Sequence, residues 1–322
     1  MRIVYWPKIQ IGKALITEQL SAQPGVELVV ADTLPQVLEA LQGAAGMVLA
    51  DAPEAEAHQV TEAIRAGGTV RWMHFVSAGR EGFEAVGLPA GVAVTYAAGA
   101  AAPAVAEHAM ALLLAAGRRI ADVLAQQAER HWDRALPASR AWALEDKTLV
   151  IVGYGQIGRE IAKRAKPFGA RIVAVSRTTP AADALVDEGL PMHRLHEALA
   201  RADAVMISVA LTADTQHLIN GAALSALKPG ALLVNVARGG VVDQAALRDA
   251  LHGKRLAGAA LDVVDPEPLP ASDPLWDSPN LILSPHFAGS GSPASARRLA
   301  QGAAENLRRF MAGEPLLHQI AG

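Results

Sequence analysis

Short runs of β-branched and other apolar residues alternate along the chain with longer stretches whose apolar positions recur at helical spacing. This alternation predicts parallel sheets with helices on their faces. In the first hundred residues the predicted strands are Ile3–Tyr5, Glu27–Val30, Gly46–Ala50, Arg71–Phe75 and Val92–Thr95. Helices are predicted between them, among others over Leu34–Leu41 and Glu54–Ala66.

A second α/β pattern begins near Leu144. The predicted elements are strands over Thr148–Val152, Arg171–Val175, Ala204–Val209, Ala231–Asn235, Gly258–Leu261 and Leu281–Ser284, and helices over Gln156–Phe168 and Pro293–Met311. Two such patterns account for nearly the whole chain. The predicted fold class is therefore α/β, with two doubly wound parallel-sheet domains.

Composition agrees with this class and narrows the function. The 322 residues are 51% hydrophobic and 19% charged, which predicts a packed core and a chain of about two domains. The 29 basic and 32 acidic residues give a net charge of −3, which argues against nucleic acid as a partner. The absence of cysteine excludes disulfides, thiolate metal sites and a cysteine nucleophile. No His or Asp cluster has the spacing of metal ligands, so no metal is predicted.

The most apolar long stretch runs from Ala97 to Gly117 and carries Pro103, Glu107 and His108 in its middle. A membrane span would place these groups in hydrocarbon at a cost of several kcal/mol in all. The stretch is therefore predicted to be a buried helix. The apolar run at Met1–Pro7 is too short for a signal peptide. We expect a cytoplasmic protein without a membrane partner.

A GxGxxG pattern, Gly153 to Gly158, directly follows the strand Thr148–Val152 and opens a predicted helix. In such a loop the first glycine permits a tight turn, the second lets the backbone approach a pyrophosphate, and the third lets the helix pack on the strand. The N–H groups of the helix then face the phosphates. This context predicts dinucleotide binding. The alternative is a glycine-rich turn that holds no cofactor.

The residues at the end of the next strand indicate whether NAD or NADP is preferred. NAD-specific domains place an acidic residue there to bind the ribose 2′-OH. Here Arg171–Val175 runs into Ser176-Arg177-Thr178-Thr179, and the next acid is Asp183. One guanidinium and three hydroxyls suit a phosphate. We therefore predict a preference for NADP, with NAD possible. The alternative is that Arg177 stacks on adenine or points into solvent.

Three polar residues follow apolar strands closely, where α/β folds place their ligand sites. Arg238 precedes Gly239-Gly240, Glu267 lies between two prolines, and His286 follows Ser284-Pro285. Taken singly, they read as a salt-bridging arginine, a loop acid and a packing histidine. Taken together, they fit one chemistry. The guanidinium can hold a carboxylate and polarise a carbonyl, the imidazole can pass a proton, and the carboxylate can orient the imidazole.

The other histidines lack such a setting and are predicted to be structural or at the surface. They are His58, His74, His108, His131, His193, His196, His217, His252 and His318.

With these motifs in order, the chain resembles the D-isomer-specific 2-hydroxyacid dehydrogenase family from about Trp72 to Gly289. The stretches that carry the resemblance are Ser77-Ala78-Gly79, Ala106-Glu107-His108-Ala109, Gly153–Gly158, Leu211-Thr212 with Asp214-Thr215, Asn235–Gly240, Leu261-Asp262-Val263 with Glu267-Pro268, and Ser284-Pro285-His286. Arg80 departs from the pattern, because an apolar residue is common at its position; a solvent-facing side chain is the simple alternative.

The resemblance implies two Rossmann/flavodoxin-like doubly wound parallel-sheet domains with a cleft between them. A substrate domain would comprise residues 1–99 plus 290–322, and a dinucleotide-binding Rossmann domain residues 100–289. The substrate would lie in the cleft. Members are usually dimers, so the resemblance implies a homodimer with the helix around Val105–Ala116 at its interface.

The resemblance also implies a role for each matching residue. Arg238 would bind the substrate, His286 would be the acid/base, and Glu267 would pair with that histidine. Ser77, Ala78 and Gly79 would meet the substrate carboxylate, and Asp262 would lie near the nicotinamide carboxamide. The expected cofactor-binding residues are Gly153, Gly155, Gln156, Ile157, Gly158, Ser176, Arg177, Thr178, Val209, Thr215, Val236, Ala237 and Asp262.

The expected reaction is hydride transfer from a reduced nicotinamide to a small 2-oxoacid, glyoxylate or hydroxypyruvate being reasonable first trials, to give a D-2-hydroxyacid. Two alternatives remain open. One is a phosphite-type oxyanion dehydrogenase; a formate-type enzyme is disfavoured because those relatives carry glutamine in place of Glu267. The other is a cofactor-sensing binding protein of the same fold.

Overall fold

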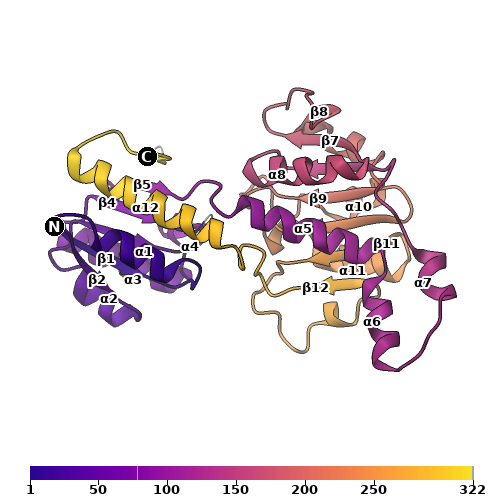
Figure 1. The fold of residues 1–322 in the computed structure, drawn as a ribbon, viewed down its shortest axis with the longest axis horizontal. Helices are drawn as coiled ribbons and strands as arrows, with labels where there is room; N and C mark the ends of the chain where they lie inside the picture. Colours follow the sequence, from indigo (N-terminus) through magenta and orange to yellow (C-terminus); the bar gives the residue numbers. More distant parts are fainter. Residues whose placement is uncertain (78, 321–322) are drawn as a thin grey trace. The chain divides into compact units, whose positions relative to one another are not determined.

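The structure, a computed structural model, describes residues 1–77 and 79–320. It divides into two compact units (Figure 1). The first unit consists of Met1–Ala101 and Ser290–Gly322, and the second of Ala102–Gly289. Each unit contains its own parallel sheet, so the predicted fold class is confirmed.

Five parallel strands form the sheet of the first unit, in the order β2-β1-β3-β4-β5, which is the flavodoxin-like order. The strands are β1 (Arg2–Trp6), β2 (Glu27–Val30), β3 (Gly46–Leu49), β4 (Trp72–Phe75) and β5 (Ala93–Tyr96). The helices are α1 (Lys13–Ser21), α2 (Leu34–Ala40), α3 (Glu54–Gly67), α4 (Glu81–Val86) and α12 (Pro293–Ala312).

Alternate residues of β1 show how this unit is layered. Ile3 and Tyr5 pack into one apolar cluster with residues of α1 and α12. Val4 and Trp6 pack into another with residues of α2 and α3. Because successive strand residues point to opposite faces, both faces of the sheet are covered by helices.

Seven parallel strands form the sheet of the second unit, in the order β12-β11-β10-β9-β6-β7-β8. The strands are β6 (Thr148–Val152), β7 (Arg171–Ser176), β8 (Glu188–Pro191), β9 (Ala204–Ile207), β10 (Ala231–Asn235), β11 (Leu256–Leu261) and β12 (Leu281–Leu283). The order reverses between β6 and β9, so the glycine loop after β6 lies at the switch point, where such sheets bind ligands.

Helices cover both faces of this second sheet as well. The helices of this unit are α5 (Ala102–Gly117), α6 (Ile120–Ala128), α7 (Ala135–Arg140), α8 (Gln156–Ala165), α9 (Leu195–Leu199), α10 (Gly221–Ala226) and α11 (Gln244–His252), with 3₁₀ turns at Lys166–Phe168, Met192–Arg194, Gly239–Val241 and Pro274–Asp277. Helices α5 and α8 lie side by side along one face (Figure 1). Helices α9, α10 and α11 pack on the other.

Two of the predicted helical segments have different bounds in the structure. The helix expected over Gln156–Phe168 ends at Ala165 and continues as a 3₁₀ turn, because Pro167 lacks the N–H that an α-helix needs. The apolar stretch Ala97–Gly117 becomes helical at Ala102. In the part of the chain that the structure describes, no helix is long and apolar enough to cross a membrane.

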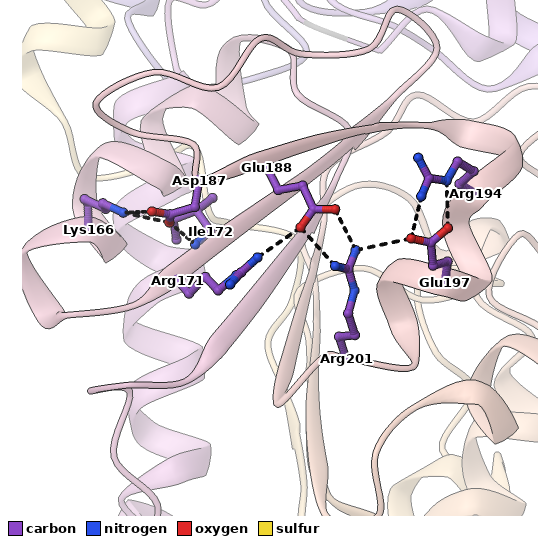
Figure 2. Close-up of polar contacts among 8 residues, drawn as sticks. All are labelled: Lys166, Arg171, Ile172, Asp187, Glu188, Arg194, Glu197 and Arg201. Atoms are coloured by element: carbon purple, nitrogen blue, oxygen red, sulfur yellow. Dashed lines mark hydrogen bonds and ion pairs between the residues drawn. The ribbon is translucent and has the colours of Figure 1, made fainter.

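Strand β8 was not expected from the sequence, because Glu188-Gly189-Leu190-Pro191 has little strand propensity. Ion pairs hold this edge strand in place (Figure 2). The carboxylate of Glu188 accepts hydrogen bonds from Arg171 of β7 (3.0 Å) and from both terminal nitrogens of Arg201 (2.9 and 3.1 Å). Next to it, Asp187 pairs with Lys166 at 2.7 Å. Ion pairs thus stabilise β8, whose sequence has little tendency to form a strand.

We expect Glu188→Gln to lower the free energy of unfolding by about 1 kcal/mol at pH 7, since exposed pairs contribute up to about 1 kcal/mol each. Hydrogen bonds and charge from Arg201, with Arg171, lower the pKa of Glu188 against the opposing effect of burial. Its contribution is therefore full above the ordinary glutamate pKa and is lost as the pH falls through the lowered value. Urea unfolding across this pH range measures the effect.

Glu62→Gln is the matched control, since Glu62 makes one exposed pair with Arg65 on α3. It should change stability by no more than a few tenths of a kcal/mol. Salt should shrink the Glu188 effect by screening. A difference that stays the same in 1 M salt would show that packing, and not charge, holds β8.

Candidate active site

Three loops that follow adjacent strands carry the residues expected to be catalytic. Arg238 follows β10, Glu267 lies in the loop after β11, and His286 comes shortly after β12. These strands are parallel neighbours. Their carboxyl ends therefore meet at one edge of the sheet, and the structure brings the three side chains to that edge.

His286 and Glu267 are in direct contact. His286 Nδ1 lies 2.7 Å from Glu267 Oε2, and Glu267 Oε1 accepts a hydrogen bond of 3.1 Å from the Val264 N–H. Burial alone would raise the pKa of Glu267, but the hydrogen bond and charge of His286, with smaller effects of Val264 and Arg238, lower it. Glu267 is thus an anion that fixes the orientation of the His286 ring. Both residues line a cavity of about 590 Å³.

The loop that carries Arg238 packs directly on the loop that carries Glu267. A methyl group at Gly239 would lie 2.0 Å from the carbonyl carbon of Val264, so only glycine permits this approach. Arg238 Nη1 donates to the Ala237 carbonyl at 2.7 Å. Asn235 Nδ2 donates to the backbone carbonyl of Arg238 at 2.9 Å. One bond thus ties the guanidinium to its own loop and the other holds the backbone of that loop, and the charge of Arg238 is close enough to Glu267 to help lower the pKa of that carboxyl.

The glycine loop after β6 has the geometry expected of a pyrophosphate cradle. Gly153 has φ 97°, and a methyl group at Gly158 would lie 2.1 Å from the Gly153 carbonyl oxygen. By contrast, a Cβ at Gly155 would meet nothing within 4 Å. No side chain caps the first N–H groups of α8, which begins at Gln156. Open space and uncapped N–H groups fit a bound phosphate.

The end of β7 presents the residues expected to select the cofactor. Ser176 is half-buried, and Arg177 and Thr178 are exposed. The nearest acid, Asp183, accepts hydrogen bonds from the Leu185 and Val186 N–H groups at 2.7 and 2.9 Å. These bonds hold the pKa of Asp183 below its usual value. Oδ1 of Asp183 is thus bonded within its own turn.

Asp262 lies at the centre of a hydrogen-bond cluster beneath the His286 loop. Its buried carboxylate accepts from Ser284 Oγ (2.6 Å) and from the N–H groups of Phe287 (3.2 Å) and Ala288 (3.0 Å). The Asp262 carbonyl accepts from the His286 N–H at 2.8 Å. His286 itself has φ 48°, an uncommon backbone conformation for a non-glycine residue. These contacts fix the strained loop that carries His286.

His108, which the sequence left without a role, belongs to this cluster. Its Nε2 lies 3.1 Å from Ser284 Oγ and 3.3 Å from Asp262 Oδ1. Its ring packs edge-on against Phe287, with 4.6 Å between centroids. The motif Ala106–Ala109 marks His108 in the sequence. It does not show the contact with Ser284, because the two residues are 176 positions apart.

The remaining expected residues lie at strand ends. Val209 lies at the start of the loop after β9, and Thr215 Oγ1 stabilises this loop by donating to the Ala210 carbonyl at 2.7 Å. Val236 and Ala237 follow β10 and are buried.

In the first unit, Ser77 Oγ accepts from the Asp51 N–H (2.9 Å) and donates to the Gly79 carbonyl (2.8 Å). The structure does not describe Ala78. Among the residues that it does describe, no group of three or more potential ligands could hold a metal.

Comparison with known proteins agrees with this geometry. Residues 110–288 match a family model described as the NAD binding domain of D-isomer specific 2-hydroxyacid dehydrogenase. A glyoxylate reductase from Korarchaeum cryptofilum is 40% identical over 228 residues, which are 70% of this chain and 68% of the relative.

Solved structures cover the chain more fully. A protein from Thermus thermophilus is 32% identical, with a TM-score of 0.82 and full coverage of both chains. A D-isomer specific 2-hydroxyacid dehydrogenase from Xanthobacter autotrophicus, solved with NADPH and MES, is 26% identical. Its TM-score is 0.79, and the match covers 99% of this chain and 98% of that one.

Proposed function

The chain belongs to the D-isomer-specific 2-hydroxyacid dehydrogenase family, and we propose that it reduces a small 2-oxoacid to a D-2-hydroxyacid with a reduced nicotinamide dinucleotide. The observation that carries this proposal is the 2.7 Å contact between His286 and Glu267, at the sheet edge that also carries Arg238. The glyoxylate reductase activity of the Korarchaeum relative supports a small 2-oxoacid.

Arg238, His286 and Glu267 have different tasks in this reaction. When bound, the reduced nicotinamide supplies a hydride to the carbonyl carbon. Arg238 holds the substrate carboxylate and polarises the ketone. Because Nδ1 of His286 faces Glu267, its Nε2 donates the proton to the developing alkoxide oxygen, and Glu267 stabilises the imidazolium ring before transfer.

For the cofactor, we propose a preference for NADP(H). The exposed Arg177 and the hydroxyls of Ser176 and Thr178 would bind the 2′-phosphate, and Oδ1 of Asp183, the next acid along the chain, is bonded within its own turn. The Xanthobacter relative was solved with NADPH, which agrees with this preference.

We also propose a homodimer whose interface includes α6 and the outer face of α5. None of the residues of α6 is buried, and Ile120, Val123 and Leu124 are 42%, 43% and 58% exposed. An apolar helix that buries none of its residues is typical of an interface. Light scattering should give twice the mass of the chain, and Leu124→Glu should halve it; a wild-type monomer would refute the dimer.

A substrate panel tests the proposed activity. Glyoxylate, hydroxypyruvate and other 2-oxoacids are tried with NADPH and with NADH, and the chirality of the product is determined. We expect turnover of at least one 2-oxoacid to the D-product. No turnover with any 2-oxoacid, combined with tight dinucleotide binding, would refute the activity and favour a cofactor-sensing protein.

A further inference from the structure

His108 is held in a defined position by the helix that carries it. On α5, the neighbouring residues Ala106 and Ala109 are fully buried, in an apolar cluster with residues of β6, β10 and β11. The side chain of His108 is only 17% exposed. A side chain on a packed helix is placed more precisely than one on a loop. His108 is therefore a fixed point against which a loop of the second unit can be ordered.

The ring of His108 contacts the loop of the candidate acid on both sides of His286. Its Nε2 lies 3.1 Å from Oγ of Ser284, two residues before His286. The ring packs edge-on against Phe287, the residue after His286, with 4.6 Å between centroids. Between these two contacts, the backbone of His286 has φ 48°, a conformation that a non-glycine residue keeps only where its surroundings enforce it. His108 is thus placed to enforce it.

The hydrogen bonds around Ser284 assign a proton to Nε2 of His108. Ser284 Oγ lies 2.6 Å from Asp262 Oδ1 and donates its single proton to that oxygen. The contact between Ser284 Oγ and His108 must then use a proton of the imidazole, so Nε2 is the donor. The same Nε2 lies 3.3 Å from Asp262 Oδ1. An imidazole N–H thus faces both the serine oxygen and the carboxylate.

Packing alone does not account for an imidazole at this position. The buried residues of α5 are alanine, methionine, leucine and glycine, and an apolar side chain can also pack against the ring of Phe287. The imidazole adds a hydrogen-bond donor beside Asp262, whose side chain is 1% exposed. A buried carboxylate is costly unless its oxygens are hydrogen-bonded. This carboxylate also accepts the N–H groups of Phe287 and Ala288, so the donor acts on the group that anchors the loop.

We propose that His108 is a positioning residue for His286. Through its bond to Ser284 and its contact with Asp262, the Nε2–H group holds the loop of residues 284–288 in the conformation that keeps the His286 imidazole against Glu267. His108 acts through this loop and needs no contact with the substrate. This inference rests on the proposed function and adds a residue to the machinery of proton transfer.

A double-mutant cycle tests whether His108 acts through His286. His108→Leu should lower the single-turnover rate on the best 2-oxoacid by about 10- to 100-fold, because a small displacement of a catalytic group has an effect of this size. KM for the 2-oxoacid should change less than about threefold, because Arg238 binds the carboxylate in the proposed function.

The second arm of the cycle uses a His286→Asn background, which keeps the loop conformation and lacks the acid. There, His108→Leu should lower the rate less than about threefold, because the two substitutions remove the same contribution. Equal losses in both backgrounds would overturn the proposal, since His108 would then act on another part of the reaction.

Glutamine and asparagine variants separate the donor from the ring. His108→Gln places an amide N–H about as far from the backbone as Nε2, whereas His108→Asn places it at the level of Nδ1. We expect His108→Gln to keep most of the wild-type rate and His108→Asn to behave like His108→Leu. Losses of equal size in the glutamine and asparagine variants would assign the effect to packing and overturn the donor role. His196→Leu, which removes an exposed histidine from α9 of the same unit, is the matched control and should leave the rate unchanged.

Amide hydrogen exchange tests the same loop without any substrate. The N–H groups of Phe287 and Ala288 donate to the Asp262 carboxylate, and that of His286 donates to the Asp262 carbonyl. His108→Leu should speed their exchange by about tenfold, the effect of one charge-assisted hydrogen bond, and His108→Gln should not. Unchanged exchange in His108→Leu would overturn the proposal even if no 2-oxoacid is turned over. An active wild type whose rate His108→Leu does not change would also overturn it, and would leave the proposed activity standing.

Discussion

Replacing His286 with alanine is expected to lower kcat on the best 2-oxoacid by about 10²–10⁴-fold, the contribution of a positioned general acid. The affinity for the dinucleotide should stay within about twofold, because the glycine loop after β6 and the end of β7 bind the cofactor in this proposal. The imidazole is the only part of the His286–Glu267 pair that can deliver a proton at neutral pH, since Glu267 is an anion there. Stopped-flow single turnover and cofactor titration measure the two quantities.

A second variant is needed to separate loss of the imidazole from strain in the backbone of residue 286. At φ 48° an alanine is strained, so His286→Ala alone could act through the loop. Asparagine tolerates this conformation but does not transfer the proton. Equal losses in the alanine and asparagine variants would assign the effect to the missing acid. If His286→Asn keeps most of the wild-type turnover, the acid/base role is wrong, whatever the alanine variant does.

The sequence predicts most of the fold because its strands are strongly patterned. β6, β7 and β10 are continuous apolar runs, as expected of strands buried on both faces. β8 was not predicted, because ion pairs of Glu188 and Asp187 stabilise it. Their partners, Arg171, Arg201 and Lys166, come from other elements. Long-range charge pairing leaves no local pattern along the chain.

In the candidate site, too, local sequence patterns predict some residues, and long-range contacts determine the others. Arg238, Glu267 and His286 were predictable because each follows a strand, and adjacent parallel strands bring their ends together. His108 was not, because its contacts with Ser284 and Asp262 depend on how α5 packs across the sheet. In the sequence, Gly239 is one of several glycines in a motif. Its close approach to Val264, which joins the Arg238 and Glu267 loops, becomes visible only in three dimensions.

The choice of cofactor gives the second large effect. The wild type should prefer NADPH over NADH by roughly ten- to a hundredfold or more in kcat/KM, because charge-assisted hydrogen bonds contribute about 1.5–3 kcal/mol each. Ser176→Asp combined with Arg177→Leu should reverse the preference. The new carboxylate would accept hydrogen bonds from the ribose hydroxyls and repel the 2′-phosphate, and the variant would lack the guanidinium that binds it.

The controls separate the 2′-phosphate contact from a general effect of charge. Arg248→Leu removes another surface arginine of the second unit, one paired with Asp249 on α11, and should leave the NADPH to NADH ratio unchanged. Raising the salt concentration should weaken the wild-type preference, because Arg177 is exposed and its attraction to a phosphate is screened. If the wild type uses NADH as well as NADPH at low salt, Arg177 does not bind the phosphate. Membership of the family is unaffected by that result, since the glycine loop would bind the pyrophosphate that both cofactors share, and the His286–Glu267 pair would act on the substrate.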